Sequence, residues 1–222
     1  MADHSIRGKV ALIAGGGKNL GGLIARDLAG HGARAVVVHY NSESSRAEAE
    51  TTVAAVRALG AEAVALQGDL TRAGAVERLF AEAVDAVGRP DIAINTVGKV
   101  LKKPLMEISE AEYDEMAAVN GKSAFFFLKE AGRHVNDHGK IVTLVTSLLG
   151  AFTPFYSSYA GTKRRWSISR GRRPRSSGRG AFRSQPWGRG PWTRRSSTAR
   201  KARTRWPITR VRRRCRRSRL RG

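Results

Sequence analysis

The sequence of 222 residues has one cysteine, Cys215, and no long apolar run. A single cysteine cannot form a disulfide framework, which favours a reducing compartment. The first residues, MADHSIRGKV, lack the apolar segment of a signal peptide. No apolar run approaches the roughly 20 residues that are needed to span a bilayer. These absences predict a cytoplasmic protein without a membrane segment, and we expect no bound metal.

Acidic residues are absent from residues 164–222, although that segment contains 23 of the 41 Lys and Arg residues. Residues 1–163 hold the other 18 basic residues and all 18 acidic ones, so their formal net charge is zero. The net charge of +23 therefore belongs to the C-terminal segment. All four tryptophans also follow Lys163. We predict a folded domain over residues 1–163 and a disordered basic tail, rich in Arg, Gly, Ser and Trp, over residues 164–222.

Residues 1–163 alternate between short apolar runs and amphipathic segments. The apolar runs predict buried strands, at residues 9–14, 35–39, 61–66, 91–95 and 140–145. The amphipathic segments predict helices, at residues 23–28, 45–59, 71–87 and 109–129. Ser109 and Glu112 have the spacing of a capping box at the start of the last of these helices. Alternating strands and helices are typical of a doubly wound α/β fold with a parallel sheet, the Rossmann type.

A glycine-rich turn, GGGKNLGG, occupies residues 15–22 between the first strand and its helix. Glycines allow a close approach of the backbone to a ligand, and a helix N-terminus favours an anion. The order strand, glycine turn, helix therefore predicts a site for a phosphate group. A tight turn without a ligand is the alternative interpretation.

Tyr159 and Lys163 form a Tyr-x-x-x-Lys pattern, which places both side chains on one face of a helix. An ammonium group beside a phenol favours the phenolate, because the positive charge stabilises the ionised form. Ser147 lies upstream, after an apolar run. These three side chains are suited to passing a proton to or from a substrate oxygen.

In their order along the chain, these motifs resemble those of the short-chain dehydrogenase/reductase family, and the resemblance covers residues 1–163. The glycine motif of the family corresponds to Ala14-Gly15-x-x-x-Asn19-x-Gly21, in which Asn19 replaces a glycine. Asparagine tolerates a left-handed backbone better than most residues, so we expect the turn to keep its shape. Asn95-Thr96-Val97-Gly98 resembles the Asn-Asn-Ala-Gly motif with two replacements.

The resemblance implies roles for residues that match the family pattern. The implied catalytic residues are Asn120, Ser147, Tyr159 and Lys163. Tyr159 would be the general acid or base, and Lys163 would lower the pKa of Tyr159 and hold the nicotinamide ribose. Ser147 would bind the substrate oxygen, and Asn120 would support a water relay. The expected cofactor-binding residues are Gly15, Lys18, Asn19, Leu20, Gly21, His39, Asn41, Ser42, Asp69, Leu70, Asn95, Val97, Gly98, Tyr159 and Lys163. The implied reaction interconverts a small-molecule carbonyl and an alcohol.

The end of the second strand bears on the choice between NADP and NAD. An acidic residue there would accept hydrogen bonds from the ribose of NAD and repel the 2′-phosphate of NADP. The segment His39-Tyr40-Asn41-Ser42 has no carboxylate before Glu43, and Lys18 adds a positive charge in the glycine turn. We therefore expect NADP, with NAD as the less favoured cofactor. In the alternative interpretation, Lys18 is only a solvated side chain.

The tail admits two interpretations. Arginines and interspersed tryptophans are suited to binding nucleic acid without sequence preference, through phosphates and base stacking. However, the tail begins one turn after Tyr159, where the family has more helix and two further strands. One added base after the Lys163 codon, with permitted synonymous codons, restores a helix continuation, an apolar strand and Pro-Gly-Pro. We therefore favour a frameshift at Lys163.

A frameshift at this point would leave the fold incomplete. The strand at residues 140–145 would then lie at an exposed edge of the sheet, where aggregation is favoured. The family's substrate pocket and homo-oligomer interface would be lost in large part. We therefore expect this form of the enzyme to be inactive.

Overall fold

The computed structural model describes residues 5–151 and 153–168, with side chains described only as far as Arg164 in the last helix. The predictions for residues 169–222, including a disordered tail, lie outside the described residues. All elements named below belong to residues 5–168.

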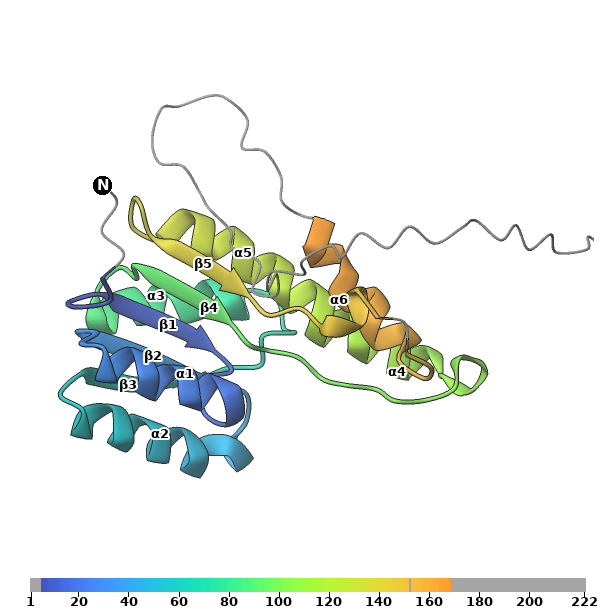
Figure 1. Ribbon diagram of the computed structural model, residues 1–222, viewed down its shortest axis with the longest axis horizontal. Coiled ribbons are helices and arrows are strands. Elements are labelled where there is room, and N and C mark those ends of the chain that lie inside the picture. Colours follow the sequence, from blue (N-terminus) through green and yellow to red (C-terminus); the bar gives the residue numbers. More distant parts are fainter. Residues whose placement is uncertain (1–4, 152, 169–222) are drawn as a thin grey trace, which may run out of the picture. The chain divides into compact units, whose positions relative to one another are not determined.

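Five strands form one parallel sheet in the order β3-β2-β1-β4-β5 (Figure 1). They are β1 Val10–Ala14, β2 Ala35–Tyr40, β3 Glu62–Gln67, β4 Ile92–Asn95 and β5 Lys140–Thr143. Every residue of β1 and β2 is buried, as continuous apolar runs predict for central strands that are covered on both faces. The doubly wound parallel sheet that the sequence predicts is confirmed.

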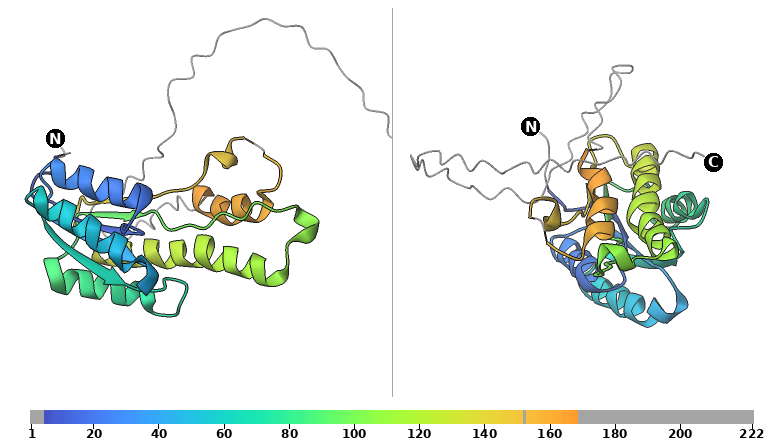
Figure 2. Two further views of the ribbon diagram at one scale, coloured as in Figure 1. Left: turned by 90° about the horizontal axis from the view of Figure 1, so that it is seen from below. Right: turned by 90° about the vertical axis from the view of Figure 1, so that its right-hand side faces the viewer.

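Helices cover both faces of this sheet (Figure 2). Helices α1 Asn19–Gly30 and α2 Arg46–Ala58 pack against one face, over a cluster that includes Ile13, Val36 and Val38. Helices α3 Ala75–Val87 and α5 Ser123–His134 pack against the other face. The core on that side includes Phe80 and Phe127, whose ring centroids are 5.3 Å apart. Because successive side chains of a strand point to opposite faces, Leu12 and Ile13 belong to different clusters.

The third helix begins four residues later than the sequence suggests. It starts at Ala75 after Gly74, which has a φ of +71°. The preceding residues form a turn in which the Asp69 carboxylate accepts hydrogen bonds from the Thr71 amide at 3.0 Å and from the Thr71 hydroxyl at 2.7 Å. Such side-chain bonds to the local backbone compete with helix formation. The prediction of a helix from Thr71 was therefore wrong at its start.

The predicted helix at residues 109–129 is three consecutive pieces. Helix α4 Glu110–Met116 is followed by the π-helical segment η3 Ala117–Lys122 and then by α5. The predicted capping box is confirmed, because the Glu112 amide donates to Ser109 Oγ at 3.3 Å and the Ser109 amide donates to Glu112 Oε2 at 2.8 Å. Single π-turns inside helices are frequent at functional sites, and Asn120 lies in this one.

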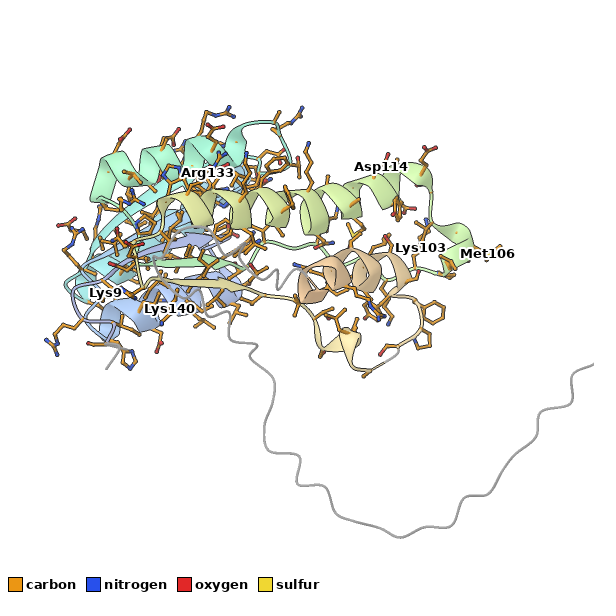
Figure 3. All side chains as sticks on the ribbon, turned by 90° about the horizontal axis from the view of Figure 1, so that it is seen from above. Lys9, Lys103, Met106, Asp114, Arg133 and Lys140 are labelled. Carbon is orange, nitrogen blue, oxygen red and sulfur yellow. The ribbon has the colours of Figure 1, made fainter. Side chains whose placement is uncertain are left out.

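Helix α6 Ser157–Ile168 lies beside α4 and η3, and Figure 3 shows Lys103, Met106 and Asp114 at the end of this helix group that extends beyond the sheet. Short turns η1 Glu43–Ser45, η2 Leu105–Glu107 and η4 Ser147–Leu149 lie in the connections. Within the described residues, β5 pairs with β4 alone and forms one edge of the sheet. This agrees with the edge position that the sequence predicts for the fifth strand.

Candidate active site

A cleft of about 840 Å³ lies where the chain leaves the carboxyl ends of the strands. In an open α/β sheet this edge is where ligands bind. Eleven of the fifteen predicted cofactor-binding residues line the cleft, namely Gly15, Lys18, Asn19, Leu20, Gly21, His39, Asn41, Asp69, Leu70, Val97 and Gly98. Ser42, Asn95, Tyr159 and Lys163 are not among its lining residues.

The glycine turn forms one wall of the cleft. Gly15 has a φ of +76°, a conformation that favours glycine, and a Cβ atom at Gly21 would collide with the Gly15 carbonyl oxygen. Asn19 also has a positive φ, +50°, as expected for an asparagine in place of a glycine. The turn leads into the N-terminus of α1. Its backbone is therefore shaped to lie close to an anionic group.

His39, the fifth residue of β2, connects the glycine turn to Gly68, which follows β3. Its side chain is buried, and its Nδ1 atom accepts a hydrogen bond from the Gly15 amide at 3.1 Å. Its Nε2 atom lies 2.7 Å from the Gly68 carbonyl oxygen. Since an amide can only donate, Nδ1 carries no proton, and Nε2–H is the donor to Gly68. Burial lowers the pKa of His39, against the smaller opposing effects of the Gly68 bond and the Asp69 charge.

Thr96 was missed as a site residue, although it stands inside the motif at residues 95–98. Its hydroxyl lies 2.8 Å from the Ala14 carbonyl oxygen and 3.1 Å from that of Gly15, and it lines the cleft. A threonine directly after a strand, in a motif that otherwise has asparagine, is the signal that points to it. The side chain links the end of β4 to the glycine turn.

The charged groups that bear on cofactor choice are Lys18 in the glycine turn and the residues that follow β2. Lys18 Nζ lies 3.1 Å from Glu48 Oε1, and both side chains are about half exposed, so Lys18 is paired as well as solvated. The Glu43 carboxylate is bound by Arg46 at 2.5 Å, and this hydrogen bond lowers the pKa of Glu43. Arg46 also lies over the ring of Tyr40, 5.9 Å from its centroid. The nearest carboxylate after β2 is therefore occupied by a cation.

The wall after β3 contains Asp69. The hydrogen bond from the Thr71 hydroxyl is the main cause that lowers the pKa of Asp69. Thr71 and Leu70 line the cleft beside it. The carboxylate therefore stays ionised in the neutral range and holds the turn that leads to α3.

Lys163 lies against the segment of residues 97–99, which lines the cleft. Only 3% of Lys163 is exposed, and its Nζ donates to the Val97 carbonyl oxygen at 2.8 Å and to that of Leu144 at 3.4 Å. Burial lowers the pKa of Lys163 from 10.5 to about 8. A Cβ atom at Gly98 would lie 2.8 Å from Lys163 Nζ. The absence of a side chain at residue 98 thus leaves room for the ammonium group.

Asn120 holds the same segment from the η3 side. It is fully buried, its Oδ1 accepts from the Lys99 amide at 3.0 Å, and its Nδ2 donates to the Lys99 carbonyl oxygen at 2.9 Å. Asn95 Oδ1 accepts from the Val97 amide at 2.9 Å. Asn95, Asn120 and Lys163 therefore fix residues 97–99 from three directions.

Ser147 and Tyr159 lie outside the residues that line the cleft. Ser147 begins η4 and is exposed, whereas Tyr159 is half-buried on α6, with its ring edge-on to that of Tyr156 at 6.5 Å between centroids. The structure thus brings two of the four predicted catalytic residues, Asn120 and Lys163, to the same segment. The other two stand on the connection after β5 and on the helix that follows it.

The cleft has twelve further lining residues that were not among the predicted site residues. They are Gly17, Tyr40, Ser45, Thr71, Thr96, Lys99, Asp114, Glu115, Ala118, Val119, Ser123 and Leu144. Lys99 pairs with Glu115 across the cleft wall. Over residues 5–151 and 153–168, no group of three or more His, Cys, Asp and Glu residues is arranged to hold a metal ion. Among these same residues, no helix is long and apolar enough to cross a membrane.

A known protein family and individual known proteins are similar to this chain. Residues 15–167 match the family model described as enoyl-(acyl carrier protein) reductase. A short-chain dehydrogenase/reductase of Pestalotiopsis microspora is 38% identical over 157 residues, which are 70% of this chain and 58% of that protein. Elsinochrome reductase 1 of Elsinoe fawcettii is 37% identical over 165 residues, covering 73% of this chain and 60% of the relative.

Solved structures show the same pattern. A protein from Burkholderia cenocepacia, described as a dehydrogenase and solved with bound NADP, is 72% identical, with a TM-score of 0.73 over 74% of this chain and 62% of that one. A dehydrogenase/reductase from Sinorhizobium meliloti is 34% identical, with a TM-score of 0.69 over 73% of this chain and 65% of that one. The matched part therefore spans about three fifths of the length of these relatives.

Proposed function

The chain belongs to the short-chain dehydrogenase/reductase family, and we propose from this that its reaction is the NADP(H)-linked interconversion of a small-molecule carbonyl and an alcohol. The observation that carries the proposal is the position of Lys163. A Cβ atom at Gly98, a residue that lines the cleft, would lie 2.8 Å from the ammonium nitrogen of Lys163. A lysine that the sequence pairs with Tyr159 is thereby located beside the cleft that contains the glycine turn.

The residues of the cleft fit a dinucleotide. The glycine turn keeps its shape because Gly15 and Gly21 lack side chains, and a glycine turn at a helix N-terminus is suited to a phosphate. NADP is favoured over NAD because the carboxylate of Glu43 is bound to Arg46, while Lys18 adds a positive charge in the glycine turn. The relative from Burkholderia cenocepacia, at 72% identity, was solved with NADP. A bound nicotinamide cofactor supplies the hydride.

The side chains of this chain would handle the proton and the substrate oxygen. Tyr159 would donate a proton to the carbonyl oxygen in reduction and accept one in oxidation, and Ser147 would hold that oxygen by a hydrogen bond. Lys163, four residues after Tyr159 on α6, would favour the phenolate through its positive charge. Asn120 would position residues 97–99 through its two hydrogen bonds to the backbone of Lys99. It would also support a water relay.

We further propose that this chain is impaired as an enzyme because of a frameshift after Lys163. The matched part of the chain spans about three fifths of its relatives, and the match to the family model ends at residue 167. Ser147 is exposed and lies outside the cleft lining. The direct test is to sequence the coding DNA around Lys163 and to compare NADPH oxidation by this chain and by the chain with one base restored.

The abrupt change in charge at residue 164 favours nucleic acid binding as a second candidate function. A segment with 23 basic and no acidic residues will bind nucleic acid electrostatically, with an affinity that falls steeply as salt rises. The test is competition among defined RNA and DNA sequences at physiological salt. A preference for one sequence that is lost on truncation at Lys163 supports an evolved tail, whereas equal competition supports a frameshift.

A further inference from the structure

A chain of hydrogen bonds crosses the carboxyl ends of four strands beneath the cleft. Its members are Thr96 after β4, Gly15 after β1, His39 in β2 and Gly68 after β3. We call these residues the strand-end hydrogen-bond chain. The Thr96 hydroxyl lies 3.1 Å from the Gly15 carbonyl oxygen and 2.8 Å from that of Ala14. The Gly15 amide donates to His39 Nδ1, and His39 Nε2 donates to the Gly68 carbonyl oxygen.

The peptide groups of Gly15 are thus held from both sides. Its carbonyl oxygen lies 3.1 Å from the Thr96 hydroxyl and its amide lies 3.1 Å from the imidazole of His39. Gly15 has the positive φ on which the shape of the turn depends. A Cβ atom at Gly15 would lie 2.7 Å from Thr96 Oγ1, so the hydroxyl closes the space on that side. The conformation of the turn therefore depends on these two side chains.

His39 can accept from the Gly15 amide and donate to the Gly68 carbonyl oxygen in only one protonation state. A neutral imidazole with its proton on Nε2 satisfies the Gly15 amide and the Gly68 carbonyl together, whereas a doubly protonated ring presents an N–H to the N–H of Gly15. His39 is 2% exposed, so the hydrogen bond to the Gly15 amide is lost at a position with little access to solvent. We propose that His39 is the positioning residue of the glycine turn, and that protonation of its ring at acidic pH releases the turn and weakens binding of an adenine nucleotide.

The other charged groups around the ring are already engaged. Asp69, which follows β3, opposes deprotonation of the ring, but its carboxylate is held by Thr71 and by Arg72 at 3.3 Å. Lys18 in the glycine turn is paired with Glu48. Lys99 after β4 is paired with Glu115. Each of these charged side chains therefore has a partner other than the His39 ring.

The positioning of the turn by His39 is independent of the proposed function, whereas its effect on nucleotide binding rests on that function. Two substitutions separate the roles of the two ring nitrogens. His39→Asn places an amide oxygen near the position of Nδ1 and keeps an acceptor for the Gly15 amide at every pH. His39→Gln reaches the position of Nε2 and keeps a donor for Gly68, but leaves the Gly15 amide without its acceptor.

The first measurement is amide hydrogen exchange of the full chain without nucleotide, expressed as protection relative to the unstructured rate. We expect the protection of the Gly15 amide to fall by about 3- to 10-fold in the wild type as the pH decreases from about 7.5 to below the lowered pKa of His39, the change expected for one lost hydrogen bond. It should stay constant in His39→Asn and be low throughout in His39→Gln. The Gly16 amide, which donates to the Ile13 carbonyl oxygen at 3.2 Å, is the internal control and should not change. Equal Gly15 protection in all three proteins would overturn the proposal.

The second measurement is the affinity for 2′,5′-ADP. The phosphates of this probe titrate in the same range, so the relevant quantity is the ratio of the Kd of the wild type to that of His39→Asn at each pH. This ratio should rise by about 3- to 10-fold on acidification. A ratio that is independent of pH overturns the role of His39 in nucleotide binding. If no variant binds the probe at any pH, the proposed function fails, and the exchange result alone decides whether His39 positions the turn.

Discussion

Lys163 Nζ donates a hydrogen bond to the carbonyl oxygen of Val97 at 2.8 Å, which joins helix α6 to the segment that follows β4. The two residues are far apart in the sequence, and the bond brings the lysine to the rear of the cleft. The described partners of the ammonium group are backbone carbonyl oxygens, of Val97 and Leu144. A carbonyl dipole compensates a buried charge less well than a carboxylate, which is why burial dominates the titration of this lysine.

We therefore predict that Lys163 titrates with a pKa of about 8 in the folded chain. Isotope-labelled reductive methylation followed by NMR reports the titration of each lysine, and the signal that is absent in Lys163→Arg identifies this one. The unfolded chain binds more protons than the folded chain between pH 8 and the free lysine value of 10.5. Stability relative to Lys163→Met should therefore rise with pH across this window. A pKa near 10.5 would contradict the buried position.

Gly98→Ala should displace the lysine. The new Cβ atom would lie 2.8 Å from Lys163 Nζ and 3.1 Å from Asn120 Oδ1, so both side chains must move. Overpacking of this kind costs about 1–3 kcal/mol of stability, and an ammonium group pushed toward solvent should recover a pKa nearer 10.5. Urea unfolding and the lysine titration above measure the two effects.

The matched control for that substitution is Gly161→Ala on α6. A Cβ atom at Gly161 meets nothing within 4 Å, and alanine in a helix is favoured over glycine by about 1 kcal/mol. Gly161→Ala should therefore keep the Lys163 titration of the wild type and should not lower stability. If both alanine variants change the titration equally, the contact at Gly98 does not set the position of Lys163.

The ion pair between Lys18 and Glu48 leads to a prediction about cofactor choice. Glu48→Gln removes the carboxylate that lies 3.1 Å from Lys18 Nζ and frees the ammonium group for a ligand phosphate. Affinity for 2′,5′-ADP should rise by about 2- to 5-fold, in keeping with the small strength of an exposed pair, while affinity for 5′-AMP should change less. Lys18→Met should have the opposite effect. Calorimetric titration at low salt compares the two ligands, and equal changes for both would exclude a role of Lys18 at the 2′-phosphate.

The sequence predicts the central part of this fold well and the site less completely. The runs at residues 10–14 and 35–40 are buried on both faces, so their apolar character alone identifies them as central strands. The positive φ of Asn19 follows from the tolerance of asparagine for that conformation. The start of α3 was predicted wrongly, because the bond between Asp69 and Thr71 competes with the helix.

Sequence patterns could not predict the site residues whose positions depend on tertiary contacts. The cleft is lined by Asp114, Glu115 and Val119 because α4 and η3 extend past the end of the sheet. Helical periodicity in the sequence does not predict where a helix lies relative to the sheet. Thr96 is different, since it stands within a recognised motif and its hydroxyl could have been assigned to the neighbouring strand end. The patterns identified Lys163 and Asn120, but only the fold shows that both act on residues 97–99.

The last prediction compares the chain with its repaired form. Asn120, Ser147, Tyr159 and Lys163 are all present, so a search for motifs would classify the chain as an active enzyme. The proposed chemistry requires Tyr159 and Ser147 to face a substrate held in the cleft, whereas neither residue lines it and Ser147 is exposed. A misplacement of about 1 Å can cost roughly a hundredfold in rate. We therefore expect the purified chain to be poorly soluble, with β5 at a sheet edge, and to show no NADPH oxidation with simple ketones, aldehydes or quinones.

Restoring one base after the Lys163 codon should give a soluble reductase whose activity is lost in Tyr159→Phe, because phenylalanine keeps the ring and removes only the hydroxyl that would carry the proton. Binding of 2′,5′-ADP should be similar in the repaired chain and in its Tyr159→Phe variant, since the lining of the cleft comes from residues 15–144. This binding measurement separates loss of chemistry from loss of folding. Turnover by the unrepaired chain that depends on Tyr159 would refute the proposed impairment, and it would show that the first 163 residues position the phenol without the rest of the family fold.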